Sequence, residues 1–492
     1  MQYQMNEFLF AMILTELEDA VGKENCSTRA IDRVSHSVDY YWLSRMWADR
    51  GQRMPEADFV VCPENAEEVS KVVKIANYYK IPVTTWGAGG GTQGGAIPVC
   101  GGIILDNDYV TSWGKPKEDD LLKTAQIFKE SKTKYFVMDA GWYKPISQVG
   151  DWEISPVAFP SGMKAYTDKI RKMGMIPGIW FEFECAEATA KASAPEFDHL
   201  KLKKNGRVIV GEVINGRHET FFDFRNPETI KRLDQKVIGL LRDNGFGYIK
   251  VDYNTSPGAV VDGEESGGEN LRQHMEKVRE FFIKMKKEIP DLIIENCASG
   301  GCRLEPSMMD ITAMSSASDT HEGYECAVVA ANLHYLTPPR QNQIWCTLKP
   351  EYSKKRFSHI ISQGFLGRLC WSGLITDLSN EQLEEMWNAE RFYEKVSPII
   401  KRGNSYIYRT DICSFNSPQG TQAVARYSED EEQLLIVVHS FENAKEITIE
   451  LKGEYVLDES LYKSAHFVKS TKLVIFPDSD FEGNVYLLKK VN

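Results

Sequence analysis

The sequence of 492 residues predicts an α/β protein, a (β/α)8 TIM barrel with an all-β domain after it and a small α+β segment before it. Short apolar runs that end in an acidic residue alternate with longer amphipathic segments, as buried parallel strands alternate with helices. From about residue 404 the helical period disappears, and short strand-like runs separated by turn residues replace it. A chain of this length exceeds one ordinary hydrophobic core, so several domains are expected.

The first region, residues 1–106, combines helical segments with short strands. Its apolar run Phe8–Leu14 follows Glu7 and is too short for a membrane span or a signal peptide, so we assign it to a buried amphipathic helix. A strand at Ala57–Pro63, a helix at Ala66–Tyr79 and a strand at Ile81–Trp86 lead into a glycine cluster, and an apolar strand follows at 102–105.

The second region, residues 107–400, carries eight barrel-strand signals, the number that a closed barrel requires. They are Tyr109–Ser112, Tyr135–Asp139, Met175–Glu184, Thr220–Asp223, Tyr248–Asn254, Leu292–Glu295, Ala313–Asp319 and Gly367–Gly373. The helices expected with them are Asp119–Ser131, Met163–Met173, Pro227–Asn244, Leu271–Glu288 and Glu381–Ile400. Pro227 suits a first helical turn, and Gly245 suits a C-terminal stop.

The third region, residues 401–492, is predicted to be an antiparallel β-sandwich. Six short strands are expected there, at Ser405–Arg409, Gln422–Tyr427, Leu434–His439, Glu446–Leu451, Lys472–Phe476 and Asn484–Leu488.

Charge and cysteine usage narrow the partners and the compartment. The net charge of −12 disfavours a nucleic-acid partner, and no segment suggests a membrane partner. The ten cysteines lack CxxC pairs, so we interpret them as reduced thiols of a cytoplasmic protein. The sequence leaves a homo-oligomeric state open.

Acids at the C-terminal ends of barrel strands are the candidate catalytic groups. Asp252 is the candidate nucleophile, because Lys250 two positions earlier points to the same side and favours an ionised carboxylate. Asp319, at the end of another strand, is the candidate proton donor. One such acid alone could equally cap the following helix, but six of them in one barrel favour a shared site of the two-carboxylate kind used in sugar hydrolysis.

Residues from about 107 to the C-terminus resemble the family 36 glycoside hydrolases, which are best known as α-galactosidases. The matching stretches occur in the family's order: YFVMDAGWY (135–143), GIWFEFE (178–184), FFDFRNPE (221–228), YIKVDYN (248–254), ENCASGGCRLEP (295–306) and SSASDTHE (315–322). The resemblance implies a retaining double displacement, with Asp252 forming a glycosyl-enzyme ester and Asp319 acting as acid and then as base. It also implies sugar contacts, from Asp139, Trp180, Arg217, Lys250 and Cys297.

One departure from the family pattern bears on the substrate. Many members carry two adjacent acids where this chain has Asp139-Ala140, so one hydroxyl contact that helps select galactose is missing. Terminal α-galactosides are the expected substrates, and another α-glycoside is the alternative.

Metal binding is the competing interpretation of the clustered acids. Asp319-x-His321-Glu322 and Glu182-x-Glu184 could each supply ligands, but the sequence contains no HExxH or EF-hand pattern, and retaining hydrolysis needs no metal or other cofactor. We therefore predict no metal.

The glycine cluster contains a formal GxGxxG at Gly89, Gly91 and Gly94, but no helix follows directly, so it does not fit a Rossmann site. Residues 56–106 instead resemble the first half of a flavin-binding (PCMH-type) domain of the vanillyl-alcohol-oxidase and D-lactate-dehydrogenase type. The resemblance rests on two stretches, ADFVVCPENAEEVSKVVKIANYYKIPV (57–83) and GGAIPVCGGIILD (94–106).

In that flavin family, amides of such a turn bind the FAD pyrophosphate. Here they would be those of Gly87, Gly89, Gly90, Gly91 and Thr92. The family's second flavin-contacting lobe has no counterpart in this chain, so tight FAD binding is not expected. The alternative is a FAD-dependent oxidoreductase whose function this fragment defines.

Overall fold

A computed structural model of the protein describes the residues in twelve ranges. They are 5–37, 46–47, 50–63, 65–86, 97–106, 116–143, 149–212, 218–316, 318–319, 323–412, 417–462 and 470–491. The chain forms two compact units. The first contains residues 1–115, 187–189 and 208–221, and the second contains residues 116–186, 190–207 and 222–492.

The first unit contains a four-stranded sheet in the order β1-β2-β4-β3. Its strands are β1 (Cys26–Ser27), β2 (Phe59–Val61), β4 (Ile103–Asp106) and β3 (Val83–Trp86). β2, β4 and β3 run parallel to one another, whereas β1 is antiparallel to β2. The strands predicted at 57–63, 81–86 and 102–105 are confirmed. The unit also holds an antiparallel hairpin of β10 (Val210–Glu212) and β11 (His218–Phe221).

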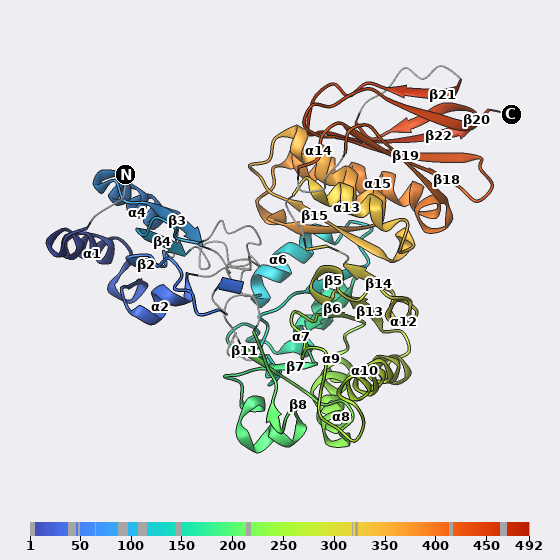
Figure 1. The fold of residues 1–492 in the computed structure, drawn as a ribbon. Helices are drawn as coiled ribbons and strands as arrows, with labels where there is room; N and C mark the ends of the chain where they lie inside the picture. Colours follow the sequence, from blue (N-terminus) through green and yellow to red (C-terminus); the bar gives the residue numbers. More distant parts are fainter. Residues whose placement is uncertain are drawn as a thin grey trace. The chain divides into compact units, whose positions relative to one another are not determined.

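Two helices of the first unit, α1 (Glu7–Val21) and α4 (Ala66–Tyr79), pack on one face of this sheet (Figure 1). The shared apolar cluster includes Leu17, Phe59 and Val72. α4 begins where the sequence predicts, because the Asn65 side chain caps it by accepting a hydrogen bond from the Glu68 backbone N–H at 3.0 Å.

The second unit is built on a seven-stranded parallel sheet in the order β16-β15-β14-β13-β12-β6-β5. The strands are β5 (Tyr135–Met138), β6 (Ile176–Phe181), β12 (Tyr248–Val251), β13 (Ile293–Asn296), β14 (Met314–Ser316), β15 (Asn342–Leu348) and β16 (Arg368–Gly373). All neighbours in this order are parallel, so the C-terminal ends of the seven strands lie along one edge.

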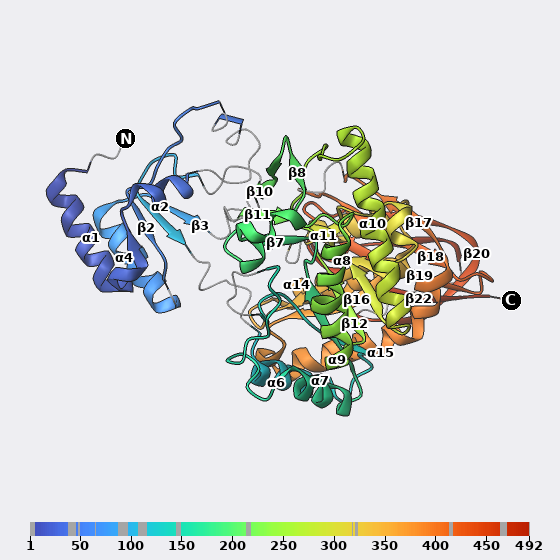
Figure 2. The same cartoon turned by 90° about the horizontal axis from the view of Figure 1, so that it is seen from below.

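Helices follow most of these strands and flank the sheet (Figures 1 and 2). They are α6 (Glu118–Phe128), α7 (Met163–Lys172), α8 (Pro227–Leu233), α9 (Leu240–Asn244), α10 (Gly267–Glu288), α13 (Glu325–Leu333), α14 (Lys354–Gln363) and α15 (Asn380–Arg402). The five predicted helices are confirmed. Pro227 lies in the first turn of α8, and Gly245, with φ of 70°, ends α9 in the left-handed conformation.

Six of the eight predicted barrel strands belong to the parallel sheet. The prediction for Thr220–Asp223 is wrong, because residues 218–221 form β11 and pair antiparallel with β10. A buried apolar run does not by itself reveal its pairing partner. β15 was not predicted, since its residues NQIWCTL end without the acid that marked six of the eight predicted strands. The strand predicted at Tyr109–Ser112 lies outside the described residues.

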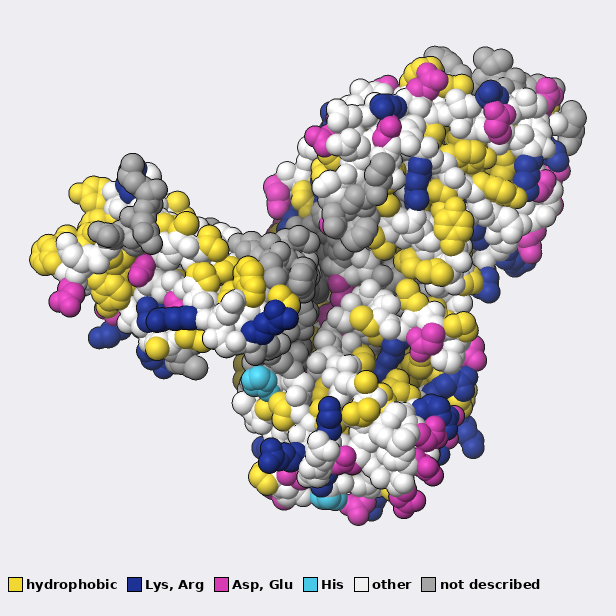
Figure 3. Space-filling model, viewed as in Figure 1, with side chains coloured by type: hydrophobic (Ala, Val, Ile, Leu, Met, Phe, Trp, Pro, Cys, Tyr) yellow, Lys and Arg dark blue, Asp and Glu magenta, His cyan; other side chains and the backbone are white. Residues whose placement is uncertain are grey.

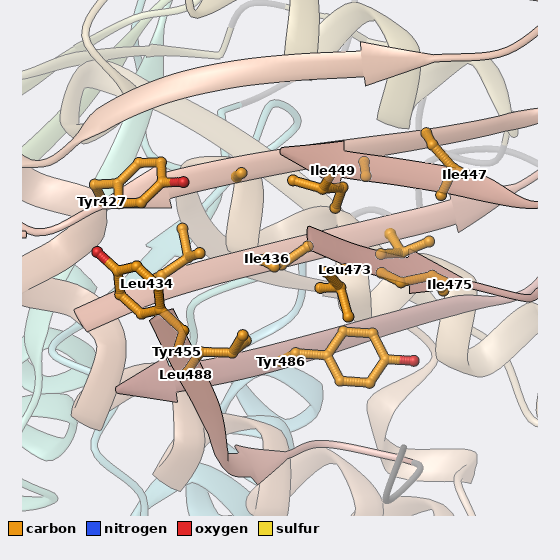
Figure 4. Packing of buried hydrophobic residues seen from close by; sticks show 13 residues of the cluster. Tyr427, Leu434, Ile436, Ile447, Ile449, Tyr455, Leu473, Ile475, Tyr486 and Leu488 are labelled. Atoms are coloured by element: carbon orange, nitrogen blue, oxygen red, sulfur yellow. The ribbon is translucent and has the colours of Figure 1, made fainter. Parts of the chain in front are cut away.

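The C-terminal part of the second unit is a six-stranded antiparallel sheet in the order β17-β18-β19-β22-β20-β21. Its strands are β17 (Asn404–Arg409), β18 (Thr421–Tyr427), β19 (Gln433–Ser440), β22 (Gly483–Lys490), β20 (Ile447–Ser460) and β21 (Ser470–Ile475), which confirms all six predicted strands. Tyr427, Ile436, Ile449 and Tyr486 come from four different strands and share one apolar core (Figure 4). α14 lies between the two sheets and contacts β15, β19 and β22.

One face of the molecule shows charges of both signs. On the face drawn in Figure 3, Lys and Arg side chains are interspersed with Asp and Glu side chains. In the part of the chain that the structure describes, no helix has both the length and the apolar character needed to cross a bilayer.

Lys201 is a buried cation in the second unit. The residue is 3% exposed, and its Nζ lies 3.6 Å from the centroid of the Phe222 ring, with no hydrogen-bond partner among the described residues. Burial lowers the pKa of Lys201 from 10.5 to about 7. The ammonium form therefore costs the folded state free energy.

Replacement of this cation, Lys201→Met, is predicted to stabilise the protein in a pH-dependent way. Below about pH 7 both folded and unfolded states hold the proton, so the burial cost is fully present and removing it gains about 2 kcal/mol or more. Between about pH 7 and pH 10.5 only the unfolded state keeps the proton. The free energy of unfolding of the wild type therefore rises with pH, by up to about 1.4 kcal/mol per pH unit. The advantage of the variant should shrink across that window.

Urea unfolding of both proteins at several pH values measures this difference. The exposed Lys287→Met serves as the control and should change the unfolding free energy by less than about 0.5 kcal/mol. An advantage of Lys201→Met that is absent, or that grows with pH, would contradict the assignment.

Candidate active site

The predicted site residues of the second unit gather at the C-terminal edge of the parallel sheet. Asp139 directly follows β5, Trp180 lies near the end of β6, Asp252 directly follows β12, and Cys297 directly follows β13. Lys250 of β12 pairs in register with Trp180 on one side and with Glu295 of β13 on the other. The structure thus brings these chain-distant residues to one place, as the strand order requires.

The Asp252 carboxylate is held by hydrogen bonds to both of its oxygens. Oδ1 accepts from the backbone N–H of Ser299 at 2.8 Å and from that of Tyr253 at 3.0 Å. Oδ2 accepts from Trp180 Nε1 at 3.2 Å. Asp252 is 8% exposed, so it is an oriented carboxylate in a largely closed setting.

Trp180 belongs to an aromatic cluster as well as to the site. Its ring stacks with that of Tyr143 at 6.3 Å between centroids and meets that of Trp152 edge-on at 6.2 Å. Its backbone carbonyl accepts from Trp142 Nε1 at 2.8 Å. With 4% of its surface exposed, Trp180 orients Asp252. Its expected stacking on a sugar stays a prediction.

Lys250 is a buried ammonium surrounded by acids. Its Nζ donates to Asp139 Oδ2 at 2.8 Å and lies 4.7 Å from the centroid of the Trp345 ring. Burial acts to lower the pKa of Lys250, but the charges of the acids around it, that of Asp139 above all, outweigh this effect and raise the pKa well above its ordinary value. Lys250 is therefore positively charged at neutral pH.

Glu295 is a site neighbour that the sequence analysis named only as the end of a strand. Its carboxylate accepts from Tyr248 Oη at 2.5 Å and from the Ser316 hydroxyl. Burial raises the pKa of Glu295, and Asp139 adds to this, against the opposing effects of Lys250, Ser316 and Tyr248. The acid at the end of the run Leu292–Glu295 was the only sequence signal for this role.

The Cys297 thiol is buried next to the end of β13, where the charges of both candidate catalytic carboxyl groups act on it. Burial raises the pKa of its thiol well above the ordinary value, and the charges of Asp252 and Asp319 raise it further. Cys297 is therefore a neutral thiol and a weak hydrogen-bond donor. Asp319 lies beside the loop that follows Cys297, because a Cβ added at Gly300 would come within 3.0 Å of Asp319 Cγ. Asp319 itself is exposed, beyond the end of β14.

Glu184 and Glu182, considered above as metal ligands, have protein partners. Glu184 forms a two-pronged ion pair with Arg303, at 2.5 Å to Nη1 and 2.8 Å to Nη2. The Arg303 guanidinium lies 3.7 Å from the centroid of the ring of Tyr253, the residue after Asp252. Glu182 accepts from the Asn254 backbone N–H at 2.5 Å and from its amide at 2.9 Å. Both acids thus brace the chain after β12.

Several predicted residues lie outside the described part of the chain. They are Arg217 of the proposed sugar site, His321 and Glu322 of the metal interpretation, and Gly87, Gly89, Gly90, Gly91 and Thr92 of the proposed flavin turn.

Comparison with curated proteins finds α-galactosidases that are distant in sequence. α-Galactosidase Mel36A of Lactobacillus acidophilus is 21% identical over 62% of this chain and 42% of its own length. α-Galactosidase 2 of Pediococcus pentosaceus is 25% identical over 50% of this chain and 34% of its own. The chain thus spans less than half the length of these relatives.

Solved structures share the fold of a large part of the chain. The GH36 α-galactosidase AgaA from Geobacillus stearothermophilus superimposes with a TM-score of 0.66 at 18% identity, over 76% of this chain and 54% of that one. The galactosidase domain of the α-galactosidase-sucrose kinase AgaSK gives a TM-score of 0.64 at 17% identity, over 76% and 52%.

Two family models match the sequence. The model of the FAD binding domain matches residues 57–125, which agrees with the resemblance noted for residues 56–106. The Melibiase model matches residues 102–403, more than half of the chain, and covers every residue placed at the sheet edge above. The chain therefore belongs to the melibiase family.

Proposed function

We propose that the chain is a retaining glycoside hydrolase that cleaves terminal α-galactosides. One observation carries the proposal: Asp252 is buried at the C-terminal edge of a parallel sheet, with both oxygens held by N–H donors and with the Lys250 ammonium nearby. Such an oriented carboxylate suits a nucleophile. Its relatives carry the name α-galactosidase, which supports the choice of substrate.

The proposed reaction has two steps. Asp252 attacks the anomeric carbon while the bond to the leaving oxygen breaks, and Asp319 gives its proton to that oxygen. Water, whose proton Asp319 takes, then cleaves the glycosyl ester on Asp252, so both carboxyl groups return to their starting states. The exposure of Asp319 supports this role, since it must meet both the leaving group and water.

Sugar recognition is assigned to the residues beside Asp252. Lys250 has three ammonium protons, of which one goes to Asp139, so the others are available to sugar hydroxyls. Trp180, Cys297 and Arg217 complete the proposed set. Ala140 offers only its backbone where many family members carry a second acid, so specificity for another α-glycoside is the alternative.

The proposed architecture follows the same family. We infer that the parallel sheet belongs to a (β/α)8 barrel over residues 107–400, followed by a β-sandwich over 401–492 and preceded by the flavin-domain-like fragment 1–106. A cytoplasmic location is supported by the nine described cysteines, all free thiols. The proposed partner is a glycoside or oligosaccharide, with neither nucleic acid nor membrane, and the oligomeric state is left open.

Substitution of the two carboxylates tests the proposal. With aryl α-galactosides, Asp252→Ala should lose several orders of magnitude in kcat, because covalent catalysis is removed. Asp319→Ala should lose about 10²–10⁴-fold on substrates with poor leaving groups and far less on activated ones. The control, Asp291→Ala, replaces an exposed acid just before β13, at the opposite edge of the sheet, and should keep wild-type activity.

A wild type that is inactive on a panel of aryl α-glycosides would refute hydrolysis. Activity on another α-glycoside but not on galactosides would keep the mechanism and correct the substrate. Full activity of Asp252→Ala would remove the nucleophile assignment.

Flavin binding is the second candidate function, favoured by the FAD binding domain match. We infer that hydrolysis needs no cofactor. We also infer that FAD is not held tightly, because the melibiase match already begins at residue 102, so the second flavin-contacting lobe of the flavin family does not follow the flavin-like match at residues 57–125.

The amount of FAD bound per chain is measured by the visible absorbance of the purified protein. The absorbance is recorded as purified, and again after FAD has been added and the unbound FAD removed by dialysis. We expect the protein to hold less than one flavin per chain. We also expect the colourless protein to hydrolyse glycosides. Stoichiometric flavin that survives dialysis would instead support the oxidoreductase alternative.

A further inference from the structure

The loop that follows Cys297 has an unusual backbone. Four consecutive residues have positive φ: Ala298 at 46°, Ser299 at 55°, Gly300 at 73° and Gly301 at 109°. For Ala and Ser this left-handed conformation costs about 1–2 kcal/mol each, and the surrounding structure must impose it. Strain of this kind concentrates at functional sites, so the contacts of this loop are of interest.

One side of the loop holds the candidate nucleophile. The Ser299 backbone N–H donates to Asp252 Oδ1 at 2.8 Å. The start of the loop is tied to the strand that carries Asp252, because the Cys297 N–H donates to the Val251 carbonyl at 2.8 Å. The turn is closed by the Gly301 N–H, which donates to the Cys297 carbonyl at 3.0 Å. Ser299 therefore meets Asp252 at a fixed distance and angle.

The next residue of the loop lies against the candidate acid/base. A Cβ added at Gly300 would come within 2.6 Å of the Asp319 backbone nitrogen, 3.0 Å of its Cγ and 3.2 Å of its Cβ. Contacts this short leave no room for a side chain. The Gly300 backbone thus packs directly against the main chain and the carboxyl group of Asp319 and limits how closely Asp319 can approach.

We propose that Ser299 and Gly300 together set the separation of the nucleophile Asp252 from the acid/base Asp319. The inference rests on the proposed hydrolase function. Both are positioning residues, since each acts through the carboxyl group it contacts. Retention requires the two carboxyl groups to lie about 5–5.5 Å apart, and a misplacement of about 1 Å can cost about 10²-fold in rate. Because Ser299 and Gly300 are adjacent in the chain, the covalent backbone between them fixes the spacing of the two carboxyl groups that they contact.

The proposal predicts a specific failure for Gly300→Ala. The added methyl group displaces Asp319 but leaves the Ser299 N–H on Asp252, so proton donation should suffer more than nucleophilic attack. In a series of aryl α-galactosides, kcat/KM should fall by about 10²-fold for the poorest leaving groups and by much less for a dinitrophenyl leaving group. Azide, which needs no general base, should raise kcat of the variant on the dinitrophenyl substrate.

Gly174→Ala is the matched control. Gly174 also has a left-handed φ, of +88°, but an added Cβ there meets no atom within 4 Å. It introduces comparable backbone strain without a clash, so its leaving-group dependence should be that of the wild type. In a double-mutant cycle, Asp319→Ala should abolish most of the additional loss caused by Gly300→Ala, because both act on the same proton transfer.

Three results would overturn the inference. The first is an equal loss of kcat/KM for all leaving groups in Gly300→Ala. The second is a leaving-group dependence of Gly300→Ala equal to that of Gly174→Ala. The third is additivity of Gly300→Ala and Asp319→Ala in the double-mutant cycle. If Gly300→Ala does not fold, Asp319→Glu is measured instead. Its extra methylene group moves the carboxyl group away from the position that Gly300 sets. Wild-type activity in that variant on poor leaving groups would refute the spacing requirement. An inactive wild type, by contrast, would refute the proposed function itself.

Discussion

A single buried ammonium group organises the acidic edge of the parallel sheet. Lys250 lies among Asp139, Asp252 and Glu295, and its Nζ is 2.8 Å from Asp139 Oδ2. Several carboxylates brought together in a closed space would repel one another and take up protons, unless a cation offsets their charge. Because Lys250 keeps its charge at neutral pH, the neighbouring acids can share this space. The oriented carboxylate of Asp252 depends on that balance.

The strand register makes this arrangement possible. Lys250 pairs with Trp180 of β6 and with Glu295 of β13, so three functional side chains lie in one layer of the sheet. Asp252, two residues after Lys250, lies in the next layer. It accepts hydrogen bonds there from Trp180 Nε1 and from the backbone that follows Cys297. A shift of one residue in any of these strands would turn its side chains to the other face. The fold and the site therefore rely on the same register.

The side chains of the site were largely predictable from the sequence, whereas its backbone was not. Asp252 and Lys250 stand out because an acid and a base two residues apart at the end of a buried apolar run point to the same side. β15 carries no such acid, and it was missed although its residues 343–348 pair with β16. The contribution of Ser299 comes from its amide and that of Gly300 from its lack of a side chain, so both depend on φ values that the residue types alone do not specify.

The proposed mechanism requires Asp252 to form a covalent bond with the sugar. The most direct measurement is peptide mass spectrometry after reaction with a fluorinated α-galactoside that forms the ester quickly and hydrolyses it slowly. The account predicts one added fluoroglycosyl group per chain, on the carboxyl group of Asp252, and its release when the trapped protein turns over. A label on a different carboxyl group, or continued hydrolysis with no trapped ester, would contradict it.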